Sequence, residues 1–197
     1  AQMMAIYKPH RGEQLLYDFP DGLYRREVAA YRLADALGWP RIPETIVRPV
    51  APFGVGSLQR FIEADFDQHY FTMLEEPRHR AQLQAMSVFD MVANNADRKG
   101  GHCLLGRDGR LWGIDHGLCF HELPKLRTVI WDFAGEPISD DHLSDLARLA
   151  GGGLPRPLTA LLHDEECRAL EMRISALLRH RRLPEPRTDR PYPWPLV

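Results

Sequence analysis

Apolar residues follow a helical spacing in two separate segments of the chain. In residues 21–37 they recur in steps of four, three and three, which places on one helix face Tyr24, Val28, Tyr31 and Ala34. Asp21 is a suitable N-cap for this helix, and Gly38 a suitable end, because glycine adopts the left-handed conformation without strain. Residues 80–93 carry apolar positions in steps of three: Leu83, Met86, Phe89 and Val92. Both segments are therefore predicted to be helices.

Short runs rich in β-branched and aromatic residues predict strands elsewhere. Residues 2–8, 45–50 and 55–62 read as three strands, the first of them ending at a proline. Residues 103–105 and 110–114 are expected to form a hairpin, because Asp108-Gly109 favours the positive φ angles of a tight turn.

Later segments complete this pattern. We expect helices over residues 140–150 and 158–180, followed by a proline-rich extended tail on the surface over residues 184–197. Strands thus dominate the first third of the chain and helices the rest, with a change of composition near residues 63–67. The fold class is therefore α+β, with a small β-rich lobe containing one helix over residues 1–62 and a mostly helical lobe over residues 63–197.

Composition bears on nucleic-acid binding, on disulfide formation and on membrane insertion. The chain has 197 residues, 44% of them hydrophobic, and a net charge of −2, so no overall positive field attracts nucleic acid. Three widely spaced cysteines favour neither disulfides nor a zinc motif, and a reducing cytoplasm is expected. No apolar run is long enough to span a bilayer, and the first residues do not resemble a signal peptide.

Candidate chemistry lies in two polar, glycine-containing loops that flank the predicted hairpin. Asp97 follows the helix of residues 80–93, and Asp115 follows the second strand of the hairpin, so folding is expected to bring the two carboxylates together. Phosphoryl transfer requires a cation that binds phosphate, a carboxylate that orients it, a carboxylate near the acceptor hydroxyl and a carboxylate that holds a metal. Lys8, Glu27, Asp97 and Asp115 occur in that order along the chain.

Ordinary structural roles also explain these residues one at a time. Lys8 and Glu27 are common surface types, and Asp97 has the character of a turn former. Asp115 is harder to explain in this way, because it follows an apolar strand where a buried carboxylate needs a partner or a metal. Considered jointly, the four residues favour a functional site. A transition-metal site of His102, Asp115, His116 and His121, pointing to a hydrolase, is the weaker alternative, since their spacing matches no compact zinc motif.

Residues 94–120 resemble the catalytic and metal-binding segments of phosphatidylinositol 3-/4-kinases. In these segments Asp-Arg opens the catalytic loop and Ile-Asp-x-Gly takes the place of the Asp-Phe-Gly of protein kinases. The run Ile114-Asp115-His116-Gly117-Leu118-Cys119-Phe120 is particularly similar to type II phosphatidylinositol 4-kinases, and the whole chain resembles a related bacterial family. The resemblance implies a protein-kinase-like fold of two lobes with a reduced N-terminal lobe.

The resemblance also implies roles for particular residues. ATP would lie between the lobes, with its adenine against the backbone near Gln59, Phe61 and Ile62 and its phosphates near Lys8, which Glu27 orients. Asp97 would face the acceptor hydroxyl, and Lys99 would contact the transferred phosphate. Asp115 would hold Mg²⁺, and His102 would occupy the second metal position.

Two departures from the family pattern leave the activity open. His102 stands where an asparagine is expected, which predicts a single metal, a softer ion such as Mn²⁺, or another role for this histidine. Lys8 lies so near the start of the sequence that the two strands and the glycine-rich loop expected to cover the phosphates do not precede it, which predicts either an N-lobe made incomplete by truncation or a protein that binds nucleotide weakly or not at all. The sequence therefore allows a kinase with an unknown acceptor, which could be lipid, protein or small molecule, or a pseudokinase that acts as a nucleotide-binding or scaffolding module.

Overall fold

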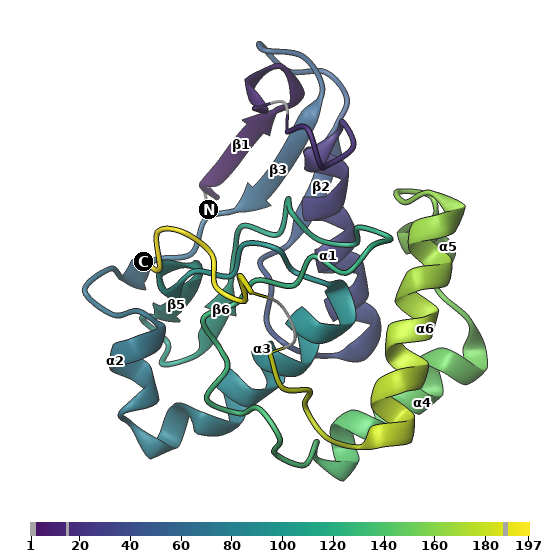
Figure 1. The fold of residues 1–197 in the computed structure, drawn as a ribbon. Coiled ribbons are helices and arrows are strands. Elements are labelled where there is room, and N and C mark those ends of the chain that lie inside the picture. The colour runs from purple at the N-terminus through teal and green to yellow at the C-terminus, as the bar shows by residue number, and fades with distance from the viewer. Residues whose placement is uncertain (1–2, 15, 187–188) are drawn as a thin grey trace.

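The computed structural model describes residues 3–14, 16–186 and 189–197, and within them two antiparallel three-stranded sheets with helices packed around them (Figure 1). The first sheet lies at the top of that view, above the second sheet and α3, whereas α4, α5 and α6 line one side. This mixture of sheet and helix confirms the α+β prediction. The division into residues 1–62 and 63–197 stays a prediction.

The first sheet holds β3 between the two other strands. Its strands are β1 (Ala5–Pro9), β2 (Thr45–Arg48) and β3 (Gly56–Arg60), in the order β1-β3-β2. All three predicted strands are present: β2 and β3 are shorter than predicted, and β1 begins three residues later and ends one residue later, at Pro9. A Cβ atom on Gly56 would lie 2.2 Å from the carbonyl oxygen of Lys8, so only glycine allows β1 and β3 to approach this closely. The backbone position of Lys8 is thereby fixed.

Helix α1 (Leu23–Leu37) begins one residue later than predicted and ends as predicted at Gly38. Its N-cap is Gly22 rather than Asp21. The first helical amides donate their hydrogen bonds to a side chain distant in sequence, not to Asp21. The Glu13 carboxylate accepts from the backbone amides of Leu23 at 2.8 Å and Tyr24 at 2.6 Å. Asp21 pairs instead with the His10 ring at 2.9 Å. A remote glutamate therefore provides the capping that the local sequence assigned to Asp21.

Helix α1 buries more of its surface than the single apolar face that was predicted. Beyond that face, α1 also buries Ala29, Ala30, Leu33 and Leu37. The helix lies between the first sheet and the helices of the second half of the chain (Figure 1). Among these, α6 (Asp164–His180) supplies Glu166, which forms a buried ion pair with Arg26 of α1. The helix that carries Glu27 is thus held on two sides.

The second sheet contains the predicted hairpin. Strands β5 (Cys103–Gly106) and β6 (Leu111–Gly113) pair around Gly109, which has the expected positive φ of 73°, and β4 (Ala64–Asp65) adds to the edge of β5. Short α2 (Tyr70–Leu74) precedes α3 (Arg80–Ala93), whose bounds are those predicted. Three-residue 3₁₀ helices cover His10–Gly12, Pro77–His79 and Gly100–His102.

The C-terminal third corrects one prediction. Helix α4 (Asp140–Gly152) matches its expected position, but the single helix over residues 158–180 is wrong. The chain forms α5 (Arg156–Thr159), turns, and starts α6 at Asp164. The Glu166 carboxylate accepts from the His163 amide at 2.9 Å, which gives the second helix its own capped start in an acidic first turn. No helix of the described residues is both long and apolar enough to cross a bilayer.

Candidate active site

Lys8 stands at the centre of the candidate site. Its ammonium lies 2.7 Å from Oε1 of Glu27 and forms a second ion pair with Oδ1 of Asp115. Strand β1, helix α1 and the loop after β6 thus contribute one residue each. The Lys8 side chain is 34% exposed and that of Asp115 is 44% exposed, whereas Glu27 is buried. The site therefore opens to solvent on the side of Lys8 and Asp115.

The loop after α3 places the remaining predicted residues beside this ion-paired group. Nζ of Lys99 lies 3.4 Å from a carboxylate oxygen of Asp97, and Nε2 of His102 lies 3.5 Å from Oδ2 of Asp115. The 3₁₀ turn Gly100–His102 leads His102 back toward the loop that carries Asp115. Lys8, Glu27 and Asp115 form one contact network with His102, and the Asp97–Lys99 pair lies at its edge.

The tautomer of His102 follows from its neighbours. Nδ1 lies 2.8 Å from the backbone oxygen of Asp97, which can only accept a hydrogen bond, so Nδ1 carries the proton. The Lys99 amide, 3.4 Å from Nδ1, is then only a neighbour. Nε2 consequently presents a lone pair toward the Asp115 carboxylate. Two lone-pair donors 3.5 Å apart form an arrangement that a divalent cation can share.

Asp115 itself is held in an unusual backbone conformation. Its φ is 56°, in the left-handed region that few residues other than glycine occupy. Aspartate adopts this conformation more readily than most other residues, so the strain is small. The conformation directs the chain after β6 so that the His116 amide donates to Oε2 of Glu27 at 3.1 Å. Glu27 therefore contacts both Lys8 and the backbone beside Asp115.

Arg98 and Asp90 are the residues that sequence reasoning missed. Both side chains are fully buried, and Nη2 of Arg98 lies 2.9 Å from Oδ1 of Asp90, with Nε 3.0 Å from Oδ2. Nη1 of Arg98 also donates to the backbone oxygens of His102 and Ile114, each at 3.2 Å. One guanidinium thus ties α3 to the two loops that carry Asp97 and Asp115. A charged residue within the apolar run of α3 was the available signal, because a buried carboxylate needs a partner.

The proposed transition-metal cluster is not assembled in the described part of the chain. Nε2 of the fully buried His116 faces Nη2 of Arg98 at 2.7 Å, and Nδ1 of His121 accepts from the Leu123 amide at 3.0 Å. Among the described residues, the group of three or more metal-binding residue types that lie close enough to share an ion consists instead of His10, Glu13 and Asp21. The four-residue metal site of His102, Asp115, His116 and His121 is therefore wrong, and with it the geometric basis of the hydrolase alternative.

The residues predicted to meet adenine lie along β3 and the segment after it. Gln59 is buried and donates from its side chain to Thr45 at 2.9 Å, and the Phe61 amide donates to the backbone oxygen of Met4 at 3.0 Å. Of the three, Ile62 has a backbone donor that forms no hydrogen bond within the described residues. Their role in nucleotide binding stays a prediction.

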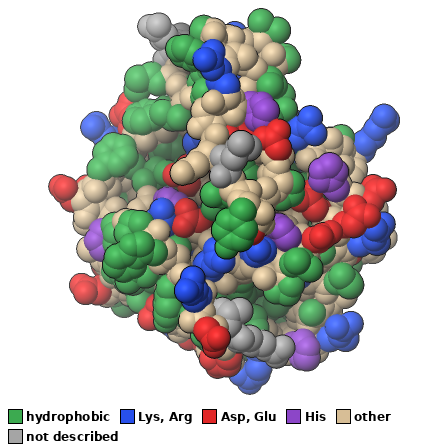
Figure 2. Space-filling view, turned by 45° about the horizontal axis from the view of Figure 1, so that its top comes forward, with side chains coloured by type: hydrophobic (Ala, Val, Ile, Leu, Met, Phe, Trp, Pro, Cys, Tyr) green, Lys and Arg blue, Asp and Glu red, His purple; other side chains and the backbone are tan. Residues whose placement is uncertain are grey.

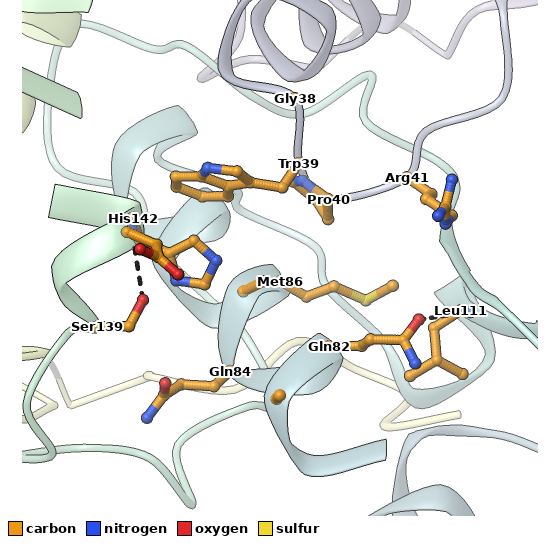
Figure 3. A pocket seen from close by; sticks show the side chains of 13 residues that line it. Gly38, Trp39, Pro40, Arg41, Gln82, Gln84, Met86, Leu111, Ser139 and His142 are labelled. Carbon is orange, nitrogen blue, oxygen red and sulfur yellow. Dashed lines mark hydrogen bonds between the residues drawn. The ribbon is translucent and has the colours of Figure 1, made fainter. Parts of the chain in front are cut away.

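A hollow of about 270 Å³ is lined by Phe61 and Ile62 themselves. Two larger hollows lie away from these two residues. One, of about 390 Å³, is lined by Lys8, Glu27 and Gly117 together with the start of α1. The other, of about 500 Å³, lies between the segment after α1, helix α3 and the start of α4, and is lined by Trp39, Met86 and His142 among others (Figure 3). None of the predicted site residues lines this second hollow.

Charged side chains of both signs are scattered over the face shown in Figure 2, without a large area of one sign.

The two candidate carboxylates have opposite pKa shifts. Burial is the largest influence on Asp97 and raises its pKa, with only partial opposition from the Lys99 ammonium. Burial acts in the same sense on Asp115, but the Lys8 ammonium outweighs it and lowers the pKa of Asp115. Burial likewise opposes the charge on Lys8, and Glu27 with Asp115 outweighs it, so that the pKa of Lys8 is raised. Lys8 and Asp115 therefore stay ionised as a pair near neutral pH.

Protonation of His102 is expected to destabilise the fold in mild acid. Burial, and secondarily Arg98, lowers the pKa of His102 from 6.5 to about 4. The unfolded chain then binds more protons than the folded chain between these values, so the free energy of unfolding falls as the pH drops through this window, by at most about 1.4 kcal/mol per pH unit from this group. His116 acts in the same sense, because burial also lowers its pKa.

Denaturant titrations of wild type and His102→Asn between pH 5.0 and 6.5 measure the contribution of His102 separately. We expect a shallower loss of stability in the variant than in the wild type. Equal slopes for the two proteins would show that His102 is not held neutral in the folded state.

Comparison with known proteins identifies the class. Residues 34–141, more than half of the chain, match the family model of phosphatidylinositol 3- and 4-kinases. The matched segment includes Asp97, Lys99, His102 and Asp115. The chain belongs to this kinase family, as the motifs of residues 94–120 indicated. Its membership confirms the prediction of a small kinase-like fold.

Individual relatives extend this picture. Protein Rv2133c of Mycobacterium tuberculosis is 40% identical over 96% of this chain and 81% of its own length. Phosphatidylinositol 4-kinase gamma 3 of Arabidopsis thaliana is 30% identical over 55% of this chain, and the match covers only 22% of that longer protein. Among solved structures, the proinflammatory kinase CtkA of Helicobacter pylori is 13% identical, with a TM-score of 0.47 over 81% of this chain and 80% of that one.

Proposed function

We propose that the protein is an ATP-dependent and metal-dependent phosphotransferase. The single observation that carries this proposal is the contact of Lys8 with both Glu27 and Asp115 beside the loop of Asp97. Residues up to 107 positions apart in sequence come together there, as a phosphate-binding cation and a metal-binding carboxylate must. Family membership supports the same reaction class.

The opposite pKa shifts of the two carboxylates support separate roles. Asp97, with its raised pKa and its partly exposed side chain, suits the position facing the acceptor hydroxyl, where it would accept a hydrogen bond and then the proton as the acceptor oxygen bonds to the γ-phosphorus of ATP. ADP leaves as the γ-phosphoryl group passes to the acceptor. Lys99, beside Asp97, would contact the transferred group.

The donor set fits a divalent cation. Asp115 stays ionised, and the lone pair of His102 faces its carboxylate, so these two residues would hold the ion. A carboxylate with an imidazole suits Mn²⁺ better than Mg²⁺, which prefers oxygen ligands. When bound, the ion would neutralise charge on the ATP phosphates. The acceptor is open: lipid, protein and small-molecule hydroxyls are all compatible with this site.

Replacement of Lys8 tests its proposed contact with phosphate. Lys8→Met is expected to lower the kcat/KM for ATP by roughly a hundredfold, because it removes a cation from charged phosphate oxygens. Lys125→Met is the matched control, since this lysine pairs with Asp18 at 3.0 Å outside the candidate site. The rate of ATP hydrolysis is measured from the release of phosphate, with Mn²⁺ and with Mg²⁺, for the wild type and both variants.

The same experiment separates the proposal from the pseudokinase alternative. Equal activity in wild type and Lys8→Met would contradict the role of Lys8. Nucleotide binding by calorimetry without any turnover would favour a pseudokinase that uses the fold as a binding module. A failure to bind nucleotide at all would favour a scaffold.

A further inference from the structure

Residues 191–197, here called the C-terminal strap, are hydrogen-bonded to residues 128–131 and to the loop that carries Asp97 and Lys99. The backbone oxygen of Pro191 accepts from the Thr128 amide and from Nε1 of Trp131, each at 3.0 Å. At the other end, the backbone oxygen of Leu196 accepts from the Gly100 amide at 2.7 Å. Figure 1 shows this yellow segment crossing the second sheet and ending beside β5. The extended tail predicted from its prolines is therefore docked on the loop that carries Asp97 and Lys99.

The glycines of this loop allow the strap to lie against it. A Cβ atom on Gly100 would lie 3.3 Å from Cγ2 of Val197 and 3.2 Å from the ring of Phe71, and one on Gly101 would lie 3.9 Å from Val197. Gly100 directly follows Lys99 and is three residues from Asp97. The strap thus covers the loop within a few residues of the two side chains assigned to the acceptor and the transferred phosphate.

Few interactions hold the strap in place. Among the described residues it makes no ion pair, and its larger apolar side chains are mostly exposed: Tyr192 by 51%, Trp194 by 87%, Leu196 by 39% and Val197 by 57%. Only Pro193 is buried. Its attachment therefore depends mainly on three hydrogen bonds, each of which contributes modestly because water replaces it on release.

From these contacts we propose that the strap covers the acceptor side of the catalytic loop, and that a large phosphate acceptor binds only after displacing it. This inference rests on the proposed phosphotransferase function. Water is also a phosphate acceptor, and it is small. It can still reach Asp97 when the strap is closed, because the Asp97 side chain is 28% exposed. Covering should therefore restrict transfer to large acceptors much more than ATP hydrolysis. The apparent affinity for such an acceptor equals the intrinsic affinity multiplied by the fraction of molecules that are open.

Deletion of residues 191–197 tests the proposal, with Trp194→Ala as the control, because this exposed side chain can be removed while the three hydrogen bonds stay. Transfer from ATP is measured to two probes, dephosphorylated casein and phosphatidylinositol vesicles, alongside ATP hydrolysis. We expect deletion to lower the apparent KM for at least one probe roughly tenfold, if the open form is a minor population of about a tenth. Hydrolysis should stay within about twofold of the wild type.

A measurement without turnover accompanies the assay. Hydrogen exchange at the Gly100 amide should accelerate in the deletion variant and stay unchanged in Trp194→Ala. A deletion variant that hydrolyses ATP normally, yet transfers to neither probe better than wild type, would overturn the covering role alone. Unchanged exchange at Gly100 would show that the strap is not seated there. If the wild type neither hydrolyses ATP nor transfers its phosphate, the phosphotransferase proposal is overturned, and the covering role with it.

Discussion

Asp115→Asn is expected to lower the rate of ATP hydrolysis by roughly a hundredfold to a thousandfold, because it removes the charge that would hold the cation and the partner of Lys8. The amide keeps the size of the side chain, and the Asp115 side chain is 44% exposed, so the fold should persist. Steady-state hydrolysis with Mn²⁺ and with Mg²⁺ measures the effect, and thermal unfolding verifies that the variant is folded.

Asp67→Asn provides the matched control for this substitution, because it makes the same chemical change on an exposed residue outside the candidate site. It should hydrolyse ATP at the wild-type rate. Wild-type activity in a folded Asp115→Asn variant would remove Asp115 from the site, and with it the role assigned to the loop after β6.

Asp90→Asn is expected to cost about 3–5 kcal/mol of stability, because it leaves the buried Arg98 guanidinium without its countercharge. Asp90 also accepts from Asn95 at 3.0 Å and Thr128 at 3.3 Å, so the new amide group would meet donors on several sides. For a domain of this length the loss corresponds to a fall of roughly 6–20 °C in Tm. Thermal and denaturant unfolding measure it directly.

Two further variants distinguish a coupled pair from general sensitivity of the fold. Glu63→Gln breaks an exposed pair with Arg107 at 3.6 Å and should leave the midpoint unchanged. Asp90→Asn combined with Arg98→Met should lose less stability than the sum of the two single variants, because neither buried charge is then left alone. Additive losses would contradict the account of Arg98 as the link between α3 and the two loops.

Elements fixed by local pattern could be predicted from the sequence. The bounds of α3 follow from its apolar steps, and the hairpin of β5 and β6 from Asp108-Gly109, because neighbouring residues decide both. The meeting of Lys8 with Glu27 and Asp115 was also expected, since the order of these residues matched the needs of phosphoryl transfer.

Features that depend on distant partners could not be predicted in the same way. The cap of α1 comes from Glu13, which no pattern near Asp21 reveals. The break before α6 depends on a capped start at His163, and helical periodicity alone continues across it. Likewise, the docking of the strap on Gly100 joins segments almost a hundred residues apart.

Diffraction from crystals soaked with Mn²⁺ and a non-hydrolysable ATP analogue tests the central claim most directly, because the anomalous signal of Mn²⁺ locates the ion independently of the nucleotide. The account predicts an anomalous peak bound by the carboxylate of Asp115, with the triphosphate contacting Lys8 and Asp97 facing its terminal phosphate. A nucleotide bound elsewhere, or an unaltered Lys8–Asp115 ion pair without Mn²⁺ beside it at saturating ligand, would contradict it.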